Sequence, residues 1–270
     1  MYALFAHTSG WLVLVIFMVV PALIAVSLHA VFRRFVPPEA LLPHQEVAGF
    51  LVAIVGVLYA VVLGFLVISV WSGFDLAQRN ADAETTSIAN ILFISSGMPE
   101  DVRKRQRLLL GNYVFEVLRV EWPMLADVQE DPRARGMMVA ALHEMANARF
   151  DTRDQAEMMR LSTLRSAALA AYRDLATQRR QRILDSEAHV QPTMYFAIAA
   201  GGLIVIAFVF LFGVQNWRLQ LVMTALVTAM IGLQIGIVFE MDRPFWGAIH
   251  VSSDAWSLLI HDNRLGSEAR

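Results

Sequence analysis

Residues 47–71 read VAGFLVAIVGVLYAVVLGFLVISVW, a stretch of 25 residues without a charged side chain. The hydrocarbon core of a bilayer is about 30 Å thick, and an α-helix that rises about 1.5 Å per residue crosses it in about 20 residues. Backbone groups inside lipid must be hydrogen-bonded within their own segment, and a helix meets that condition. The stretch therefore predicts a transmembrane helix and marks the chain as an integral membrane protein.

Three other parts of the chain have the same character. The 270 residues are 57% hydrophobic, and the 22 Lys+Arg and 24 Asp+Glu residues all lie outside 1–32, 47–74, 188–217 and 219–239. The alternating segments of roughly ten residues that mark membrane β-strands are not seen. The predicted fold class is an all-α integral membrane protein with four transmembrane helices, at about 11–31, 47–71, 193–214 and 219–239.

The spacing of the spans predicts two hairpins. The connections within the pairs are short, at residues 33–46 and 215–218, so each pair of helices is expected to be antiparallel. The expected domains are a transmembrane hairpin at 1–74, a soluble helical domain at 75–190, a second transmembrane hairpin at 191–240 and a C-terminal tail at 241–270.

The central domain is charged but keeps apolar residues at helical spacing. Residues 75–187 contain 16 basic and 17 acidic side chains. Helices are expected at about 74–96, from Glu100 onward, at about 133–149 and at 155–187. In the last of these, a stripe with steps of three and four residues indicates bundle packing and leaves open a direct continuation into the third span; it consists of Leu161, Leu164, Ala168, Ala171 and Leu175.

Arginines near the span ends predict the orientation, because positively charged residues favour the cytoplasmic side. One side of the membrane collects Arg79, Arg173, Arg179, Arg180, Arg182 and Arg243, whereas the other has Arg33, Arg34 and Arg218. We therefore expect the termini and the central domain in the cytoplasm, and the spans in the bacterial inner (cytoplasmic) membrane.

The second span carries a continuous stripe of small residues. Steps of four, three, four and four residues place five of them on one helix face: Gly49, Ala53, Gly56, Ala60 and Gly64. Such stripes allow helix backbones to approach closely in lipid. Three interpretations remain open, which are packing inside the chain, a contact between subunits, and the narrow wall of a pore.

The other spans contain few polar groups. In the fourth span, Gly232 and Gly236 form a GxxxG pair that predicts helix packing, and the threonines Thr224 and Thr228 are expected to bond to another helix or to their own backbone. His29 lies near the end of the first span, where we expect a solvated, interfacial histidine. No Asp, Glu, Lys or Arg lies deep in any span, although proton-coupled carriers usually require one.

The sequence gives no support for an enzyme. It has no cysteine and no P-loop, nucleophile elbow or dinucleotide fingerprint. His143 and Glu144 begin an HExxH pattern, but Asn147 stands where the second histidine is required. We predict no catalytic residue, no metal and no cofactor. A formal net charge of −2 also argues against a nucleic-acid partner.

Weak motifs in a fixed order are similar to those of the bestrophin-like proteins of bacteria and plants, also described as the DUF4239 domain of unknown function. They begin with the glycine-rich second span that ends at Gly64-Phe65 and is followed by a charged helix. The positions that carry the resemblance further along the chain are Glu84, Tyr113, Glu121 and Trp122, and then Asp242, Arg243, Pro244, Phe245 and Gly247.

The resemblance implies a function by analogy. Bestrophins are pentameric anion channels with four spans and cytosolic termini, so we expect a homo-oligomeric, anion-selective channel that passes chloride or another small anion. In this hypothesis the second span lines an apolar pore and the helical domain forms a cytoplasmic vestibule. The alternative is a membrane-anchored helical interaction or sensory protein without transport activity. Membrane lipid and further copies of the chain are the expected partners.

Overall fold

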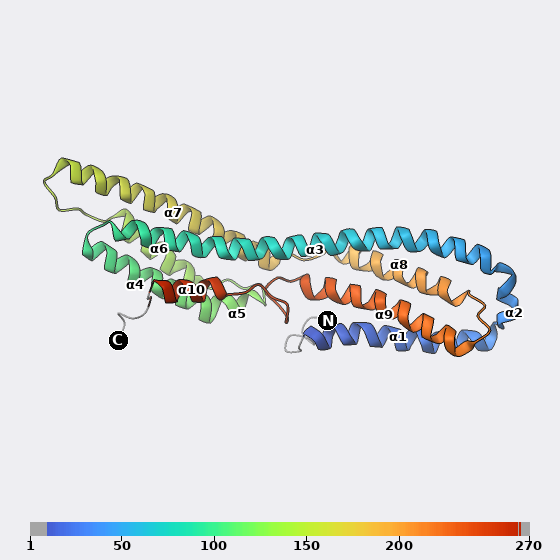
Figure 1. Ribbon diagram of the computed structural model, residues 1–270. Helices are drawn as coiled ribbons and strands as arrows, with labels where there is room; N and C mark the ends of the chain where they lie inside the picture. The colour runs from blue at the N-terminus through green and yellow to red at the C-terminus, as the bar shows by residue number, and fades with distance from the viewer. Residues whose placement is uncertain (1–9, 264, 266–270) are drawn as a thin grey trace. The chain divides into compact units, whose positions relative to one another are not determined.

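The computed structural model describes residues 10–263 and Leu265, and these residues form helices and no strand. The elements in chain order are α1 (Gly10–Phe35), α2 (Pro38–Leu41), η2 (Leu42–His44), α3 (Gln45–Ser96), α4 (Glu100–Glu116), η3 (Val117–Glu121), α5 (Trp122–Leu125), α6 (Pro132–Ala146), α7 (Gln155–Glu187), α8 (Pro192–Phe210), α9 (Trp217–Met241) and α10 (Asp254–Asp262) (Figure 1).

Four of these helices are long and apolar enough to cross a membrane, which confirms the predicted fold class: α1, α3, α8 and α9. The long helix α3 has 52 residues and passes through the second span into the charged segment without a break. The sequence around Ser72 and Gly73 contains no proline, and one glycine does not end a helix. The expected helix at 74–96 is therefore the C-terminal part of α3.

The suggested continuation of the last central helix into the third span is wrong. Helix α7 ends at Glu187 and α8 begins at Pro192. Proline has no amide N–H, and its ring disfavours the helical conformation of Gln191 before it, so a new helix begins there. Helix α8 also ends at Phe210, before the expected end of the span.

Packing divides the described chain into two compact units. Unit 1 contains residues 10–73, 189–243 and 247–249, and unit 2 contains residues 74–188, 244–246 and 250 onward. Each unit has its own buried residues, described in turn below.

In unit 1, α1 packs against α9 along the predicted GxxxG pair. A Cβ atom at Gly232 would overlap the carbonyl oxygen of Phe17, and one at Gly236 would lie 2.9 Å from the Phe17 Cβ. The ring of Phe17 also contacts that of Phe239 at 5.2 Å between centroids. The two glycines therefore allow α1 and α9 to pack at backbone distance, as the sequence predicts.

In the same unit, α3 packs against α8 through an aromatic ring on a second pair of glycines. A Cβ atom at Gly201 would lie 2.7 Å from the ring of Tyr59, and one at Gly202 would lie 3.2 Å from its hydroxyl oxygen. Leu63, one turn further along α3, is 2% exposed. Tyr59 and Leu63 thus mark the face of α3 that the rest of unit 1 covers.

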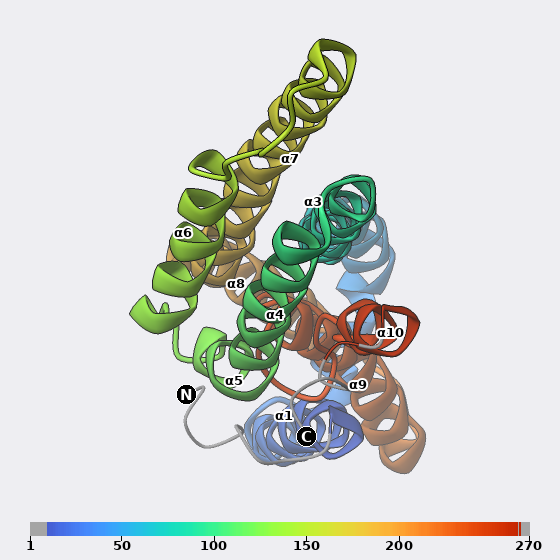
Figure 2. The same ribbon diagram turned by 90° about the vertical axis from the view of Figure 1, so that its left-hand side faces the viewer.

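Unit 2 is a helical bundle in which α6 and α7 lie side by side (Figure 2). Asp131 caps α6 by accepting hydrogen bonds from the amides of Arg133 and Ala134, at 3.0 and 3.3 Å. Asp154 caps α7 by accepting from the Ala156 amide at 2.9 Å. These side chains satisfy amides that the first turn of a helix leaves unpaired.

The segment that we expected to be a C-terminal tail contains α10. The indole of Trp256 is fully buried, and Leu259 is 5% exposed, within the apolar core of unit 2. The hydrophobic spacing from Trp256 to Leu259 buries one face of this short helix. Residues 254–262 are therefore part of the folded unit 2.

Replacing Gly232 with alanine is expected to lower the free energy of unfolding by about 1–3 kcal/mol, because the new methyl group forces α1 away from α9. The matched control is Gly73→Ala, since a Cβ atom at Gly73 meets nothing within 4 Å. That change should be neutral or stabilising by about 0.5–1 kcal/mol. Thermal unfolding of the two variants in detergent measures the difference; equal midpoints would contradict the packing described.

Candidate functional site

The small-residue stripe of the second span lies on an open part of the α3 surface. A Cβ atom at Gly56 or Gly64 would meet nothing within 4 Å among the described residues, and one at Gly49 would meet only the ring of Phe212, at 3.8 Å. Ala53 and Ala60 are exposed. Packing within the described part of the chain therefore does not account for the small residues at Gly56 and Gly64, and the stripe borders the covered face of α3 without forming it.

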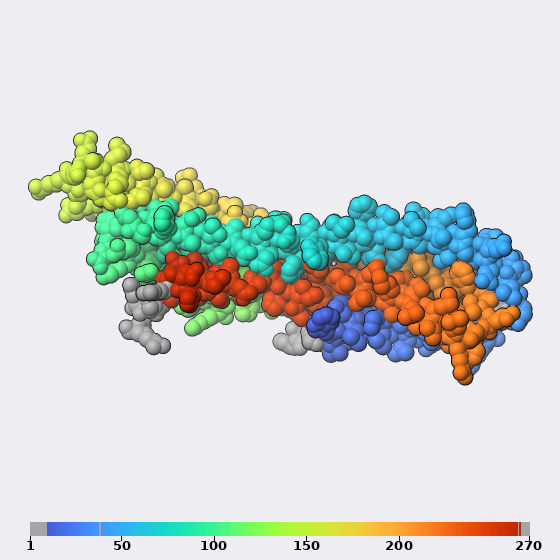
Figure 3. All heavy atoms as spheres, in the orientation of Figure 1, coloured from blue at the N-terminus to red at the C-terminus, as the bar shows by residue number. Residues whose placement is uncertain are grey.

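Large apolar side chains make up the rest of the open surface of α3 in unit 1. Most of them are more than half exposed, and the outer side of α3 in unit 1 is uncovered in Figure 3. They include Phe50, Val57, Leu58, Val61, Phe65 and Ile68. A surface of this kind needs lipid or another protein to cover it, because water would not solvate it favourably.

His29 is buried inside unit 1, which makes the expectation of a solvated interfacial histidine wrong. It has no exposed surface, and its ring stacks on Phe210 with 4.3 Å between centroids. Its Nδ1 lies 2.7 Å from the Thr224 hydroxyl oxygen, and that hydroxyl donates to the Gln220 carbonyl oxygen at 3.0 Å. Helix α1 continues to Phe35, so His29 lies within the helix and faces α8 and α9.

Unit 2 contains two buried arginines that continue the apolar stripe of α7. Arg179 follows Leu175 by four residues, and Arg182 follows three residues later. Their side chains are 4% and 0% exposed. A guanidinium group is strongly hydrated in water, so burying one requires carboxylates and hydrogen-bond acceptors around it.

Arg182 bridges two buried glutamates from different helices. Its Nε donates to Glu84 at 2.6 Å, and its terminal nitrogen donates to Glu84 at 3.3 Å and to Glu121 at 2.7 Å. Both carboxylates are fully buried. Glu84 comes from α3, and Glu121 comes from the π-helical turn η3, a type of local irregularity that often occurs at functional sites.

Arg179 extends this network toward the surface. It donates to Glu121 and, at 2.9 Å, to Glu130, which is 27% exposed. Glu121 also accepts a hydrogen bond from the Asp131 amide at 3.2 Å. The chain of ion pairs therefore begins at buried Glu84 and ends at half-exposed Glu130, and we call Glu84, Arg182, Glu121 and Arg179 the buried charge cluster.

Aromatic rings enclose the guanidinium of Arg182. Its central carbon lies 5.6 Å from the ring centroid of Trp122 and 5.5 Å from that of Trp256, and the two indoles meet edge to face at 5.9 Å. Tyr113, also fully buried, donates its hydroxyl to Glu84. Cation–π contacts and exclusion of water both strengthen the cluster's electrostatic interactions.

The ionisation of these groups follows from burial and charge. Burial raises the pKa of Tyr113 well above that of a free tyrosine, and the neighbouring Glu84 carboxylate adds to the effect. Burial alone would lower the pKa of Arg182, but the carboxylates of Glu84 and Glu121 outweigh it and the pKa is raised. Near neutral pH, Arg182 is therefore positively charged and the Tyr113 hydroxyl keeps its proton.

The turn after α9 holds the second set of resemblance residues. In unit 1, the Asp242 carboxylate accepts a hydrogen bond from the Val190 amide, and Gly247 has a φ of +80°, a conformation that favours glycine. In unit 2, the Pro244 carbonyl accepts from the Val251 amide at 2.7 Å, and Phe245 meets Trp122 edge to face at 5.6 Å. Arg243 is half-buried.

Two positions singled out by the resemblance, Glu84 and Glu121, belong to the buried charge cluster, and two more, Tyr113 and Trp122, contact it. Phe245 packs against Trp122. Sequence reasoning missed Arg179 and Arg182, which complete the cluster, and Trp256, whose indole contacts Arg182. In the sequence the two arginines indicate only the orientation in the membrane; the signal that reveals their burial is their position on the apolar stripe of α7. The cluster's carboxylates bind arginines, and the described residues contain no group of three or more His, Cys, Asp or Glu that could hold a metal ion.

Comparison with known proteins is consistent with this architecture. The family model of the bestrophin-like domain matches residues 19–256. None of the curated proteins matches the chain. A variant of a bacterial bestrophin homologue from Klebsiella pneumoniae is similar in structure, with a TM-score of 0.65, 12% identity, and coverage of 93% of this chain and 98% of its own.

Two further crystal structures are similar to the same degree. Another variant of the Klebsiella pneumoniae homologue has a TM-score of 0.64 and 14% identity, and covers 94% of this chain and 99% of its own. A protein described as a membrane protein has a TM-score of 0.63 and 14% identity, and covers 96% of this chain and 97% of its own. At such identities the likeness concerns the fold alone.

Removing Arg182 is expected to destabilise unit 2 strongly. Arg182→Ala leaves Glu84 and Glu121 buried with fewer partners, a loss typically worth about 3–5 kcal/mol. The control is Arg173→Ala, an exposed arginine on the same helix, which should change stability by less than about 0.5 kcal/mol. Thermal unfolding followed by tryptophan fluorescence compares the two; similar midpoints would mean that the cluster does not stabilise the fold.

Tyr113 predicts a dependence of stability on alkaline pH. Its folded pKa lies above the unfolded value of about 10, so the unfolded chain releases a proton that the folded chain keeps. Stability should be constant in this respect below about pH 10 and should fall as the pH rises further. Tyr113→Phe should make the fall in unfolding free energy between about pH 9 and 11.5 shallower; an unchanged slope would contradict the assignment.

Proposed function

The chain belongs to the bestrophin-like family, and we propose that it is the subunit of a homo-oligomeric ion channel whose pore is lined by the second span, in α3. Channel activity and anion selectivity rest on the similarity to bestrophins. The observation that carries the proposal for this chain is the open Gly/Ala stripe on α3: in the described part of the chain, the space beside Gly56 and Gly64 is empty, and Ala53 and Ala60 are exposed.

In a ring of identical subunits, the stripe would lie where several α3 helices meet around the symmetry axis. Small side chains at Gly56, Ala60 and Gly64 allow several α3 helices to come close, or leave a narrow open path between them. The spans contain no Asp, Glu, Lys or Arg deep in the membrane. Such a pore would be apolar, and apolar constrictions control ion flow by losing and regaining water.

The proposal also includes an orientation in the membrane and the surroundings of each subunit. The excess of arginines near one set of span ends supports cytoplasmic termini and a cytoplasmic soluble domain, with residues 75–190 as that domain and the spans in the bacterial inner membrane. Lipid and neighbouring subunits would cover the exposed apolar face of α3. Five subunits, and chloride or another small anion as the conducted ion, follow by analogy with bestrophins.

Purified protein in liposomes is expected to conduct chloride, measured as flux down a chloride gradient. Gly56→Leu should change the flux by about tenfold or more, because an added side chain either blocks a narrow apolar path or separates the packed helices. The matched control is Leu58→Phe, which adds bulk on the opposite side of the same helix and should leave the flux within about twofold.

Three outcomes are informative. Loss of flux in Gly56→Leu alone supports the stripe as pore wall or subunit contact. Equal effects of both substitutions would remove the stripe from the proposal. Flux no greater than that of empty liposomes, together with reproducible protein partners captured by crosslinking in native membranes, would favour the alternative function of a membrane-anchored interaction or sensory protein.

A further inference from the structure

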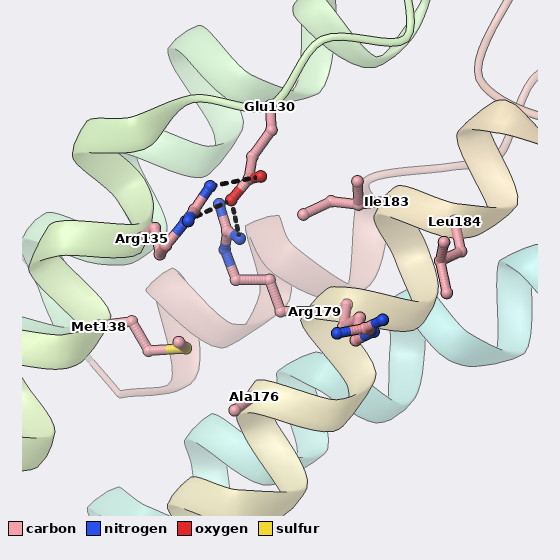
Figure 4. Close-up of a pocket in the computed structure, with 8 residues that line it drawn as sticks. Glu130, Arg135, Met138, Ala176, Arg179, Ile183 and Leu184 are labelled. Carbon is pink, nitrogen blue, oxygen red and sulfur yellow. Dashed lines mark hydrogen bonds and ion pairs between the residues drawn. The ribbon is translucent and has the colours of Figure 1, made fainter.

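Unit 2 has a cavity of about 360 Å³ that the buried charge cluster does not fill (Figure 4). It lies between the loop before α6, the first turns of α6 and the last turns of α7. Arg135, Arg179 and Arg180 supply its positive charge, and Glu130 supplies its one carboxylate. The volume falls within the range of pockets that hold small molecules.

The cavity already holds a carboxylate of the protein itself. Glu130 receives two hydrogen bonds from Arg135, at 2.8 and 2.7 Å, and one from Arg179 at 2.9 Å (Figure 4). Partial burial alone would raise the pKa of Glu130, but the two arginines outweigh it and the pKa is lowered. The fork of Arg135 is therefore arranged for a planar carboxylate, the geometry that guanidinium groups match with two parallel bonds.

A third arginine in the cavity has no partner of its own. Arg180 is exposed and makes no ion pair or side-chain hydrogen bond within the described part of the chain. The lining thus has three positive charges and one negative charge. Exposed arginines are common on surfaces, but this one lines a cavity whose other two arginines bind a carboxylate, so it leaves the site with an unpaired positive charge.

The rest of the lining is apolar. Met138 from α6 and Ile183 and Leu184 from α7 border the cavity beside the arginines (Figure 4). A fully hydrated inorganic ion gains no binding free energy from apolar side chains, whereas a ligand with an apolar body gains it by burying its surface against them. Arginines beside apolar side chains therefore favour a ligand that carries an anionic group on a compact apolar body.

From this geometry we propose that the cavity binds a small organic carboxylate. The ligand's carboxylate pairs with Arg180 and exchanges with Glu130 on Arg135, while its apolar body lies against Met138, Ile183 and Leu184. Glu130 acts as an internal competitor that occupies part of the site when no ligand is bound. This site is separate from the proposed pore and does not depend on channel activity.

Benzoate is the probe for the test, with benzamide as the neutral molecule of the same shape. The full-length protein in lipid nanodiscs is heated at increasing ligand concentrations, at constant ionic strength, and the unfolding midpoint is followed by tryptophan fluorescence. A ligand that binds only the folded chain raises the midpoint, and at a given concentration a ligand of higher affinity raises it further. Benzoate should raise it, whereas benzamide and acetate should raise it much less.

Two variants and a control locate the site. Arg180→Gln should weaken the apparent affinity for benzoate about tenfold or more, because a charge-assisted hydrogen bond is lost. Arg173→Gln, an exposed arginine on α7 outside the cavity, should bind like the natural chain. Glu130→Gln should bind several-fold more tightly, because the neutral amide competes less well for Arg135.

The expected pattern supports the site: a benzoate response that Arg180→Gln weakens, Arg173→Gln keeps and Glu130→Gln strengthens. Equal responses to benzoate and benzamide would overturn the proposal, as would a benzoate response that Arg180→Gln leaves unchanged. Binding of inorganic phosphate as tight as that of benzoate would also overturn it, because the apolar wall would then contribute nothing.

Discussion

The requirement that a chain in lipid satisfy its own backbone hydrogen bonds determines most of this structure. It forces the uncharged stretch at 47–71 into a helix, and that helix then continues, without a break, to Ser96. A helix satisfies its own backbone hydrogen bonds, but its apolar side chains must still be covered by lipid or by other helices. Along α3 the side chains around Tyr59 and Leu63 are covered within unit 1, whereas the Gly/Ala stripe and the large apolar residues beside it are left open. The proposed assembly follows from that imbalance.

Unit 2 depends on a different constraint, which is the burial of charged side chains. Two arginines on α7 occupy positions that the helical spacing assigns to core residues, and their burial is tolerated because Glu84 and Glu121 neutralise them and two indoles enclose Arg182. The same arrangement reaches the surface through Arg179 and Glu130. A network built in this way requires α3, η3, α7 and α10 to be in place together, so the buried charges specify how the elements of unit 2 pack.

The sequence predicted the features that depend on local composition. Four spans, the helix end at Ser96 before Pro99 and the GxxxG packing of α9 follow from charge gaps, proline and residue size. Features that depend on tertiary contacts could not be predicted from the sequence. The burial of His29 requires knowledge of Phe210 and Thr224 in distant helices, and the partners of Arg182 come from residues separated from it by up to 98 positions. The resemblance named Glu84, Tyr113, Glu121 and Trp122, but one sequence carries no signal that they meet.

In the proposed assembly, further copies of the same chain cover the open face of α3 around a pore. Cryo-electron microscopy of the full-length protein in lipid nanodiscs tests it most directly. We expect a closed ring of identical subunits in which Gly56, Ala60 and Gly64 face the symmetry axis or the neighbouring α3. A monomer, or a ring in which this face of α3 is turned toward lipid, would contradict it.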